Sequence, residues 1–137
     1  MAASIEPHLW ASDFRAAIAW YRRTLGFEAV AWSPDEETAN WCQMRHGEAS
    51  IMIAAVPDPA ALPAGQGYLG GIAERVAGPG GPMSLYLRVD DADGLFAMAQ
   101  ESGAEIIEQI WDAWWGGRQF TVADPDGNWW TAFQSSD

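Results

Sequence analysis

Two side chains near the start of the chain could do acid–base chemistry together. Glu6 and His8 are two residues apart in a segment, Ile5 to Ala11, where apolar and polar residues alternate. Such alternation predicts a half-buried strand in which both side chains point to the same side. They could act as a general acid–base pair or bind a ligand. Alternatively, His8 is a structural histidine held by hydrogen bonds. Contact with Glu6 would raise the pKa of the imidazole.

Tryptophan is the second chemical signal. A core of this size does not need nine indole rings, so some should line a surface that stacks on flat or cationic groups. Trp20 and Trp130 are expected in the core, whereas Trp10 and Trp129 either line a binding surface or simply pack. The nine are Trp10, Trp20, Trp32, Trp41, Trp111, Trp114, Trp115, Trp129 and Trp130.

Three of these rings form a group just before a Gly-Gly pair. Trp111, Trp114 and Trp115 predict an exposed cluster at the rim of a cleft or at a dimer contact. The alternative is a loop that folds back and plugs its own rings into the protein.

Composition narrows the function classes. The chain has 137 residues, which predicts one domain, and its net charge of −12 argues against a nucleic-acid partner. Apolar runs are far shorter than the roughly 20 residues of a membrane span, and Met1 to His8 does not read as a signal peptide. The single cysteine, Cys42, cannot form an internal disulfide. We expect a soluble, cytoplasmic protein without a membrane partner.

Elements that could position these side chains occur twice along the chain. After the strand Ile5 to Ala11, Ser12 or Asp13 should cap a helix that ends at Gly26. In it, Phe14, Ala17, Ile18 and Tyr21 lie at helical spacing. Strands are expected at 28–32, 38–45 and 49–55, with a tight turn at 46–48 between the last two.

The second copy follows the same order. A strand at 84–89 precedes a helix capped by Asp90 or Asp91, with an apolar stripe, and ended by Gly103. Its stripe consists of Ala92, Leu95, Phe96 and Ala99. Strands follow at 105–110, 119–123 and 129–134, with a turn at Asp126-Gly127. Asp13 and Asp91 are 78 residues apart, and Gly26 and Gly103 are 77 apart, so the repeat is close in register.

The pattern predicts an α+β protein made of two tandem βαβββ modules, whose curled mixed sheet surrounds a cleft. We divide the single domain 1–137 into a first module at 4–56, a linker loop at 57–82 and a second module at 83–135. The linker is rich in Gly, Pro and Ala, with a short helical turn expected near 72–76, and serves as a lid or as an inert connection.

Strand alternation assigns residues to the two sides of the sheets. The helix side should hold Ile5, Pro7, Leu9, Ile51, Ile53, Leu85, Leu87 and Val89. For the last strand either parity is possible, and analogy with the first module places Trp130 and Ala132 on the helix side. The cleft side then carries Glu6, His8, Trp10, Ser50, Met52, Ala54, Ser84, Tyr86, Arg88, Trp129, Thr131 and Phe133. This mixture of rings and a few polar groups is typical of a small-molecule site.

Two arginines could be structural or could bind. Arg88 on the cleft side either meets an anionic group or pairs with Glu6. Arg118 is expected to pair with a nearby carboxylate.

Two segments carry a family resemblance. Residues 17–30, AIAWYRRTLGFEAV, resemble the first helix of glyoxalase/bleomycin-resistance (vicinal oxygen chelate) proteins, where an aromatic-Tyr pair precedes Leu-Gly-Phe-Glu. Residues 115–133, WGGRQFTVADPDGNWWTAF, resemble the C-terminal motif of that family, with Gly-Arg, an aromatic residue and Asp-Pro-x-Gly-Asn. Gly127 and Pro125 suit the backbone of such a turn.

The resemblance implies four metal-ligand positions, one on each of four cleft-facing strands, filled in the enzymes by His, Glu or Gln. They correspond here to Glu6, Met52, Ser84 and Thr131. Only Glu6 is a competent ligand for a hard divalent metal, because a thioether and two neutral hydroxyls are not. We therefore expect no metal and no other cofactor, as in the metal-free, bleomycin-resistance-like branch.

The resemblance also implies a function. Metal-free proteins of this type form homodimers and sequester an antibiotic in an aromatic cleft between subunits or modules. We expect a planar or cationic small-molecule ligand bound by Glu6, His8, Trp10, Trp41, Met52, Ser84, Tyr86, Arg88, Trp111, Trp114, Trp115, Trp129 and Thr131. The alternative is a lyase, isomerase or dioxygenase of the same superfamily that uses Glu6 and His8. A purely structural or interaction role is the third possibility.

Overall fold

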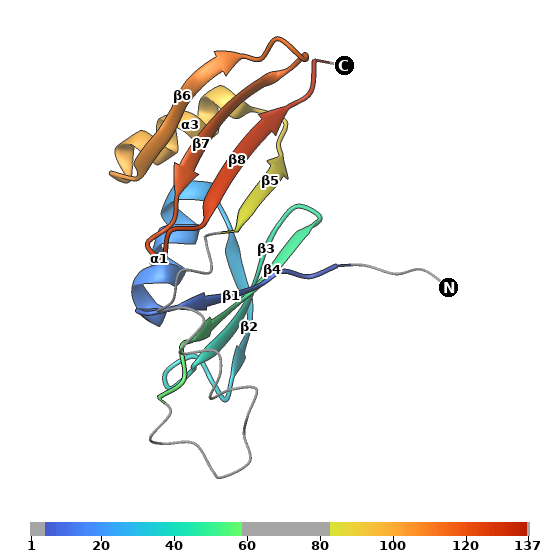
Figure 1. Ribbon diagram of the computed structural model, residues 1–137. Helices are drawn as coiled ribbons and strands as arrows, with labels where there is room; N and C mark the ends of the chain where they lie inside the picture. Colours follow the sequence, from blue (N-terminus) through green and yellow to red (C-terminus); the bar gives the residue numbers. More distant parts are fainter. Residues whose placement is uncertain (1–4, 59–82, 137) are drawn as a thin grey trace.

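The computed structural model describes residues 5–58 and 83–136. They form two helices and eight strands (Figure 1). The elements run β1 (His8–Ala11), α1 (Phe14–Leu25), β2 (Glu28–Ser33), β3 (Trp41–His46), β4 (Ala49–Ala55), β5 (Ser84–Arg88), α3 (Ala92–Glu101), β6 (Glu105–Asp112), β7 (Arg118–Ala123) and β8 (Trp129–Gln134). Among these residues no helix is long and apolar enough to cross a membrane. The expected linker lies mostly outside the described residues, and its helical turn entirely so.

Local sequence signals explain both ends of α1. The side chain of Asp13 accepts a hydrogen bond from the backbone N–H of Ala16, which satisfies one of the unpaired donors of the first turn. Gly26 ends the helix in the left-handed conformation at φ 75°, which glycine adopts without a steric cost. For α3, the cap is Asp91 rather than Asp90, and Gly103 follows the helix with φ 76°.

The strands form two separate four-stranded sheets of the same topology. The strand orders are β1-β4-β3-β2 and β5-β8-β7-β6. In each sheet the first pair is parallel and the other two pairs are antiparallel. The predicted α+β class and its two equivalent modules are confirmed.

The side of each sheet that its helix covers forms the core. Leu9, Ile51 and Ile53 are buried there in the first sheet, as are Leu87 and Trp130 in the second. The predicted helix stripes are buried as well: Phe14, Ala17, Ile18 and Tyr21 on α1, and Ala92, Leu95, Phe96 and Ala99 on α3. The assignment of the last strand by analogy is therefore correct.

The two modules contact each other on this helix side. The hydroxyl of Tyr21 on α1 donates to Asp124 Oδ2 at 2.6 Å and accepts from Trp130 Nε1 at 3.0 Å. Thr24 and Ser102 join α1 to the end of α3 at 2.9 Å. In Figure 1 the two helices lie one above the other at the left of the molecule, and β6 passes in front of α3.

One predicted core residue is misplaced. Ile5 is 92% exposed, because β1 begins only at His8 and the residues before it extend past the edge of the sheet. Alternation decides which side a residue faces only where a neighbouring strand and a helix are present to define those sides.

Candidate functional site

The side of each sheet away from its helix is here termed the open face. On the first sheet it carries His8 and Trp10 of β1, which alternate with the buried Leu9 and Ala11. The rings of His8 and Trp10 lie with their centroids 4.5 Å apart. Met52 is the ladder partner of His8, so its thioether side chain belongs to the same face.

Glu6 reaches the same open face through two hydrogen bonds. Its Oε1 accepts from Ser50 Oγ at 2.6 Å and from Gln43 Nε2 at 2.9 Å. These bonds hold the carboxylate in place beside β3 and β4. The structure gives no Glu6 contact with Arg88, whose guanidinium lies 5.7 Å from the ring centroid of Phe133 instead. The possible Glu6–Arg88 pair is therefore wrong.

Burial, rather than Glu6, sets the direction in which the pKa of His8 is shifted. Burial lowers the pKa of His8, because desolvation disfavours the charged imidazolium. Glu6 Oε1 accepts from Ser50 and Gln43 instead of contacting His8, so the contact that would raise the pKa of His8 is not formed. A neutral His8 can accept or donate a hydrogen bond, and its buried Nδ1 has no partner.

His46 is held within the structure. Its Nδ1 lies 2.8 Å from the carbonyl oxygen of Leu25, and its ring packs edge-on against Phe27. A histidine beside a tight turn is usually solvated, but here the end of α1 supplies a partner. His46 is thus a structural residue.

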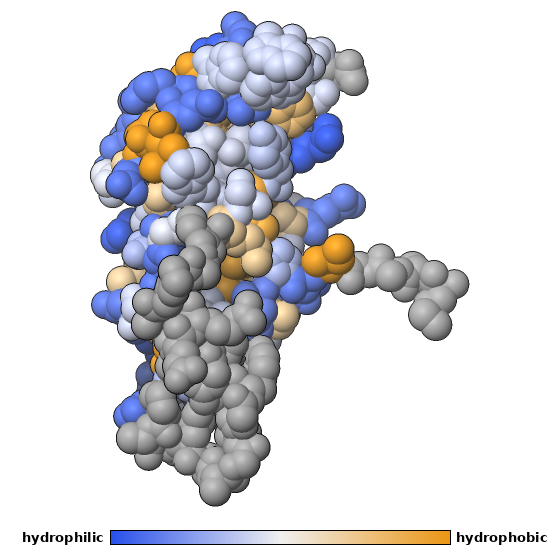
Figure 2. All heavy atoms as spheres, viewed as in Figure 1, coloured by the Kyte–Doolittle hydropathy of each residue, from blue (hydrophilic) through white to orange (hydrophobic). Residues whose placement is uncertain are grey.

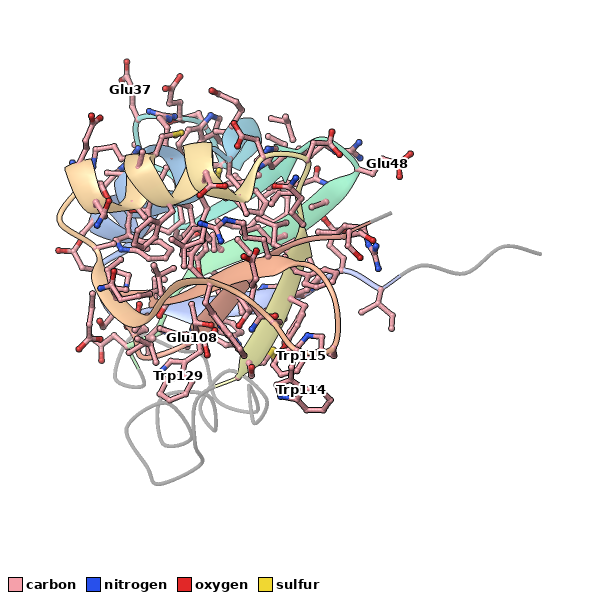
Figure 3. All side chains as sticks on the ribbon, turned by 90° about the horizontal axis from the view of Figure 1, so that it is seen from above. Glu37, Glu48, Glu108, Trp114, Trp115 and Trp129 are labelled. Carbon is pink, nitrogen blue, oxygen red and sulfur yellow. The ribbon has the colours of Figure 1, made fainter. Side chains whose placement is uncertain are left out.

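The open face of the second sheet is richer in rings. Tyr86 is 64% exposed and Trp129 is 44% exposed, whereas Thr131 between the neighbouring strands is buried. The hydroxyls of Thr131 and Thr121 satisfy each other at 2.7 Å. Figure 3 shows Trp129, Glu108, Trp114 and Trp115 on the side of the molecule away from α3.

Three further tryptophans, Trp111, Trp114 and Trp115, form a cluster at the turn from β6 to β7. Trp115 packs edge-on against both Trp111 and Trp114, with ring centroids 5.3 and 5.0 Å apart. Trp114 is 86% exposed, so the turn does not fold back as a plug. Gly117 is required there: it has φ 98°, and a Cβ would lie 2.6 Å from the Phe133 ring.

Two residues of this face escaped the sequence analysis. Gln119 is 3% exposed and donates from Nε2 to Glu108 Oε1 at 3.1 Å. Alternation along β7, with Phe120 and Val122 in the core, could have placed Gln119 beside Thr121. Glu108 was harder to find, because register shifts on both sides of it interrupt the alternation of β6.

Arg118 is structural, as expected. It donates to Asp93 and Asp112, which form the two salt bridges found among the described residues. An open depression of about 410 Å³ lies beside it, lined in part by Gln134 and Ser136. The guanidinium is already bound by carboxylates, so it is not available to a ligand there.

The four positions that correspond to the family's metal ligands do not fit a divalent metal. Glu6 is hydrogen-bonded, Met52 offers a thioether, and the Thr131 hydroxyl is paired with Thr121. In the described ranges no three His, Cys, Asp or Glu side chains gather as a metal site. Moreover, no strand of one sheet pairs with a strand of the other, so the two halves of the set lie on separate sheets.

Comparison with known proteins places the chain in one superfamily. The model of the Glyoxalase/Bleomycin resistance protein/Dioxygenase superfamily matches residues 4–132. An uncharacterised protein of Mycobacterium tuberculosis, Rv0887c, is 29% identical over 136 residues, covering 96% of this chain and 74% of that protein.

Solved structures share the fold over nearly the full length. TioX from Micromonospora sp. ML1 has a TM-score of 0.74 at 21% identity, with 98% of each chain covered. A bleomycin-binding protein complexed with bleomycin has a TM-score of 0.63 at 23% identity, covering 98% of this chain and 99% of that one. Lactoylglutathione lyase from Agrobacterium tumefaciens has a TM-score of 0.67 at 19% identity, covering 99% and 96%.

Proposed function

The chain belongs to the Glyoxalase/Bleomycin resistance protein/Dioxygenase superfamily, and from that premise we propose that it binds and sequesters a planar, antibiotic-like ligand on its open faces without converting it. The main support for this proposal is the concentration of exposed aromatic side chains on those faces. Tyr86, Trp114, Trp115 and Trp129 are each at least 44% exposed. Exposed aromatic side chains grouped on one side of a small protein are typical of a ligand or protein contact.

The few polar groups on these faces suit orientation of a ligand rather than chemistry. Glu6 and the Thr121–Thr131 pair are held by hydrogen bonds within the protein. The net charge of −12 favours a cationic ligand, since it attracts positive charge over distances of about a Debye length. A bleomycin-binding protein has the same fold, which is consistent with this ligand class.

A homodimer is part of the proposal. Within one chain the modules join on the helix side, so the open faces lie on the far sides of the sheets from that contact. We propose that a second copy covers these faces and completes the cleft between chains. In Figure 2 many side chains on the upper part of the molecule have a pale colour, which marks intermediate hydropathy. Tryptophan and tyrosine are among the residue types of intermediate hydropathy. The cytoplasmic location, consistent with a single buried thiol at Cys42, belongs to the same proposal.

Tryptophan fluorescence tests the binding. We expect bleomycin, or another planar cationic antibiotic from a panel, to quench the protein saturably at about one ligand per chain, and to be recovered unchanged. Trp129→Ala should weaken that binding roughly tenfold or more, because stacking on an indole is worth about 1–3 kcal/mol. Met98→Ala on α3 removes a similarly exposed apolar side chain away from the open faces and should leave binding unchanged.

Sedimentation tests the dimer. The wild type should sediment as a dimer, and Tyr86→Glu should shift it to a monomer that binds weakly, because it places a charge in the proposed contact. A modified antibiotic, or stoichiometric bound metal, would contradict sequestration. A wild-type monomer that binds fully would contradict the shared cleft.

A second candidate function rests on His8. An imidazole that burial keeps neutral is a candidate general base, and Glu6 lies on the same face. A glyoxalase-superfamily lyase or isomerase would then use these two residues. Turnover of a carbonyl substrate that is lost in His8→Gln would support this alternative over sequestration.

A further inference from the structure

Three buried polar side-chain atoms among the described residues have no hydrogen-bond partner: His8 Nδ1, Trp111 Nε1 and Gln119 Oε1. Native proteins pair roughly nine in ten buried polar groups, so each exception needs a reason. All three belong to the open faces. Two of them, Trp111 and Gln119, are direct ladder partners on β6 and β7. Opposed residues of an antiparallel pair project to the same side, so an unpaired donor and an unpaired acceptor share one place.

The orientation of the Gln119 amide is determined by its neighbour. Glu108 is a carboxylate that can only accept, and it accepts from Gln119 Nε2 at 3.1 Å. The carbonyl oxygen of Gln119 must therefore point to the other side of the amide, where it is left without a donor. Gln119 is 3% exposed, so bulk solvent does not reach this oxygen.

Two aromatic rings lie next to this pair. Phe133 is the ladder partner of Gln119 on β8, and Trp115 packs edge-on against Trp111. The local environment thus combines flat apolar walls with one hydrogen-bond donor and one acceptor. This combination is complementary to a planar group that carries both functions.

We propose that Trp111 and Gln119 form a subsite for the amide of an aromatic carboxamide or lactam. The ligand carbonyl accepts from Trp111 Nε1, and the ligand N–H donates to Gln119 Oε1. Because both polar atoms are buried, a ligand reaches them only if a neighbouring ring moves, and we assign this movement to Trp115, which is 47% exposed beside Gly116 and Gly117. This inference rests on the proposed small-molecule function and names the group that the ligand presents.

Two matched probes test the subsite in the full chain. Benzamide offers both a carbonyl and an N–H donor, whereas methyl benzoate offers only the carbonyl. We would titrate each into ¹⁵N-labelled protein and follow the indole N–H signals, using Trp111→Phe to identify the signal of Trp111. Benzamide should shift that signal and bind at least about fivefold more tightly than the ester, as expected for one hydrogen bond.

Variants separate the two contacts. Gln119→Met keeps the volume but removes the acceptor, so the preference for benzamide should disappear. Trp111→Phe keeps a ring but removes the donor, so both probes should weaken by a similar factor. Met98→Ala on α3 removes an exposed apolar side chain away from the open faces; it is the control and should leave the ratio of affinities unchanged.

Equal affinity of the wild type for the two probes, or a preference that survives in Gln119→Met, would overturn the subsite. The wild-type comparison needs no variant, so it decides the matter even if a variant fails to fold. Equal affinities would leave the proposed function standing, because the antibiotic titration tests that separately. Conversely, amide preference without antibiotic binding would support the subsite and contradict sequestration.

Discussion

The two sides of the sheets differ in how completely their buried polar groups are paired, although Thr121 and Thr131 on the open side do pair with each other. On the helix side, Tyr21, Asp124 and Trp130 satisfy one another across the module contact. On the open side, His8, Trp111 and Gln119 each leave an atom unpaired. Burial of an unpaired polar atom costs about 1–3 kcal/mol, whereas a paired one is nearly neutral or stabilising. This difference supports the proposal that the open side receives an occupant, whereas the helix side stabilises the fold.

The largest expected effect comes from breaking the helix-side network. Asp124 accepts hydrogen bonds from the Tyr21 hydroxyl, from the backbone N–H groups of Asp126 and Asn128, and from the Asn128 side chain. Asp124→Ala should therefore lower the free energy of unfolding by about 3 kcal/mol or more, measured by urea denaturation. Glu48→Ala, which removes an exposed acid in a turn at the edge of Figure 3, should change it by less than about 0.5 kcal/mol. A loss below about 1 kcal/mol for Asp124→Ala would mean that the network does not join the modules.

Alkaline pH should also lower the free energy of unfolding through the helix-side network, by a smaller amount. Burial, followed by the charge of Asp124, raises the pKa of Tyr21 well above its usual range. As pH rises past about 10, the unfolded chain releases this proton while the folded chain keeps it, so the free energy of unfolding falls by about 1.4 kcal/mol per pH unit. Denaturation between pH 9 and 11 should show this slope in the wild type and a shallower one in Tyr21→Phe. The same slope in both proteins would exclude Tyr21 as its source, and Tyr86→Phe on the open face is the matched control.

The smallest effect should come from the open side at acid pH. Burial lowers the pKa of His8, so the unfolded chain takes up a proton below about pH 6.5 before the folded chain does. Stability is then lost as pH falls from about 6.5 toward the lower, folded-state pKa. Urea midpoints at pH 7 and pH 5 should differ less in His8→Gln than in the wild type. If the urea midpoint of His8→Gln falls between pH 7 and pH 5 by as much as that of the wild type, burial of the His8 ring is not the source of the pH dependence.

Much of the candidate site followed from alternation, and its failures are instructive. The parity of β1, β4 and β5 placed His8, Met52 and Tyr86 on the open faces, and analogy between the two modules placed Trp129 of β8 there. The parity argument failed for Ile5, where β1 has not yet begun, and could not place Glu108, where the register shifts. The hydrogen-bond partners of these side chains were harder to predict than the faces. Glu6 binds Ser50 and Gln43, which lie 44 and 37 residues further along the chain, and no local pattern favours them over His8 or Arg88.

The sequence by itself determined the elements of this protein. Asp13, Gly26 and Asp91 act within a few residues, and strand and helix periodicity follow from backbone geometry, so both can be read locally. Only the tertiary structure decided on which side the modules meet. That choice depends on contacts such as Tyr21 with Asp124, which are 103 residues apart and are made only when two complete helix–sheet units pack. The unpaired atoms of Trp111 and Gln119 have the same origin, because an absent partner is visible only once every neighbour is in place.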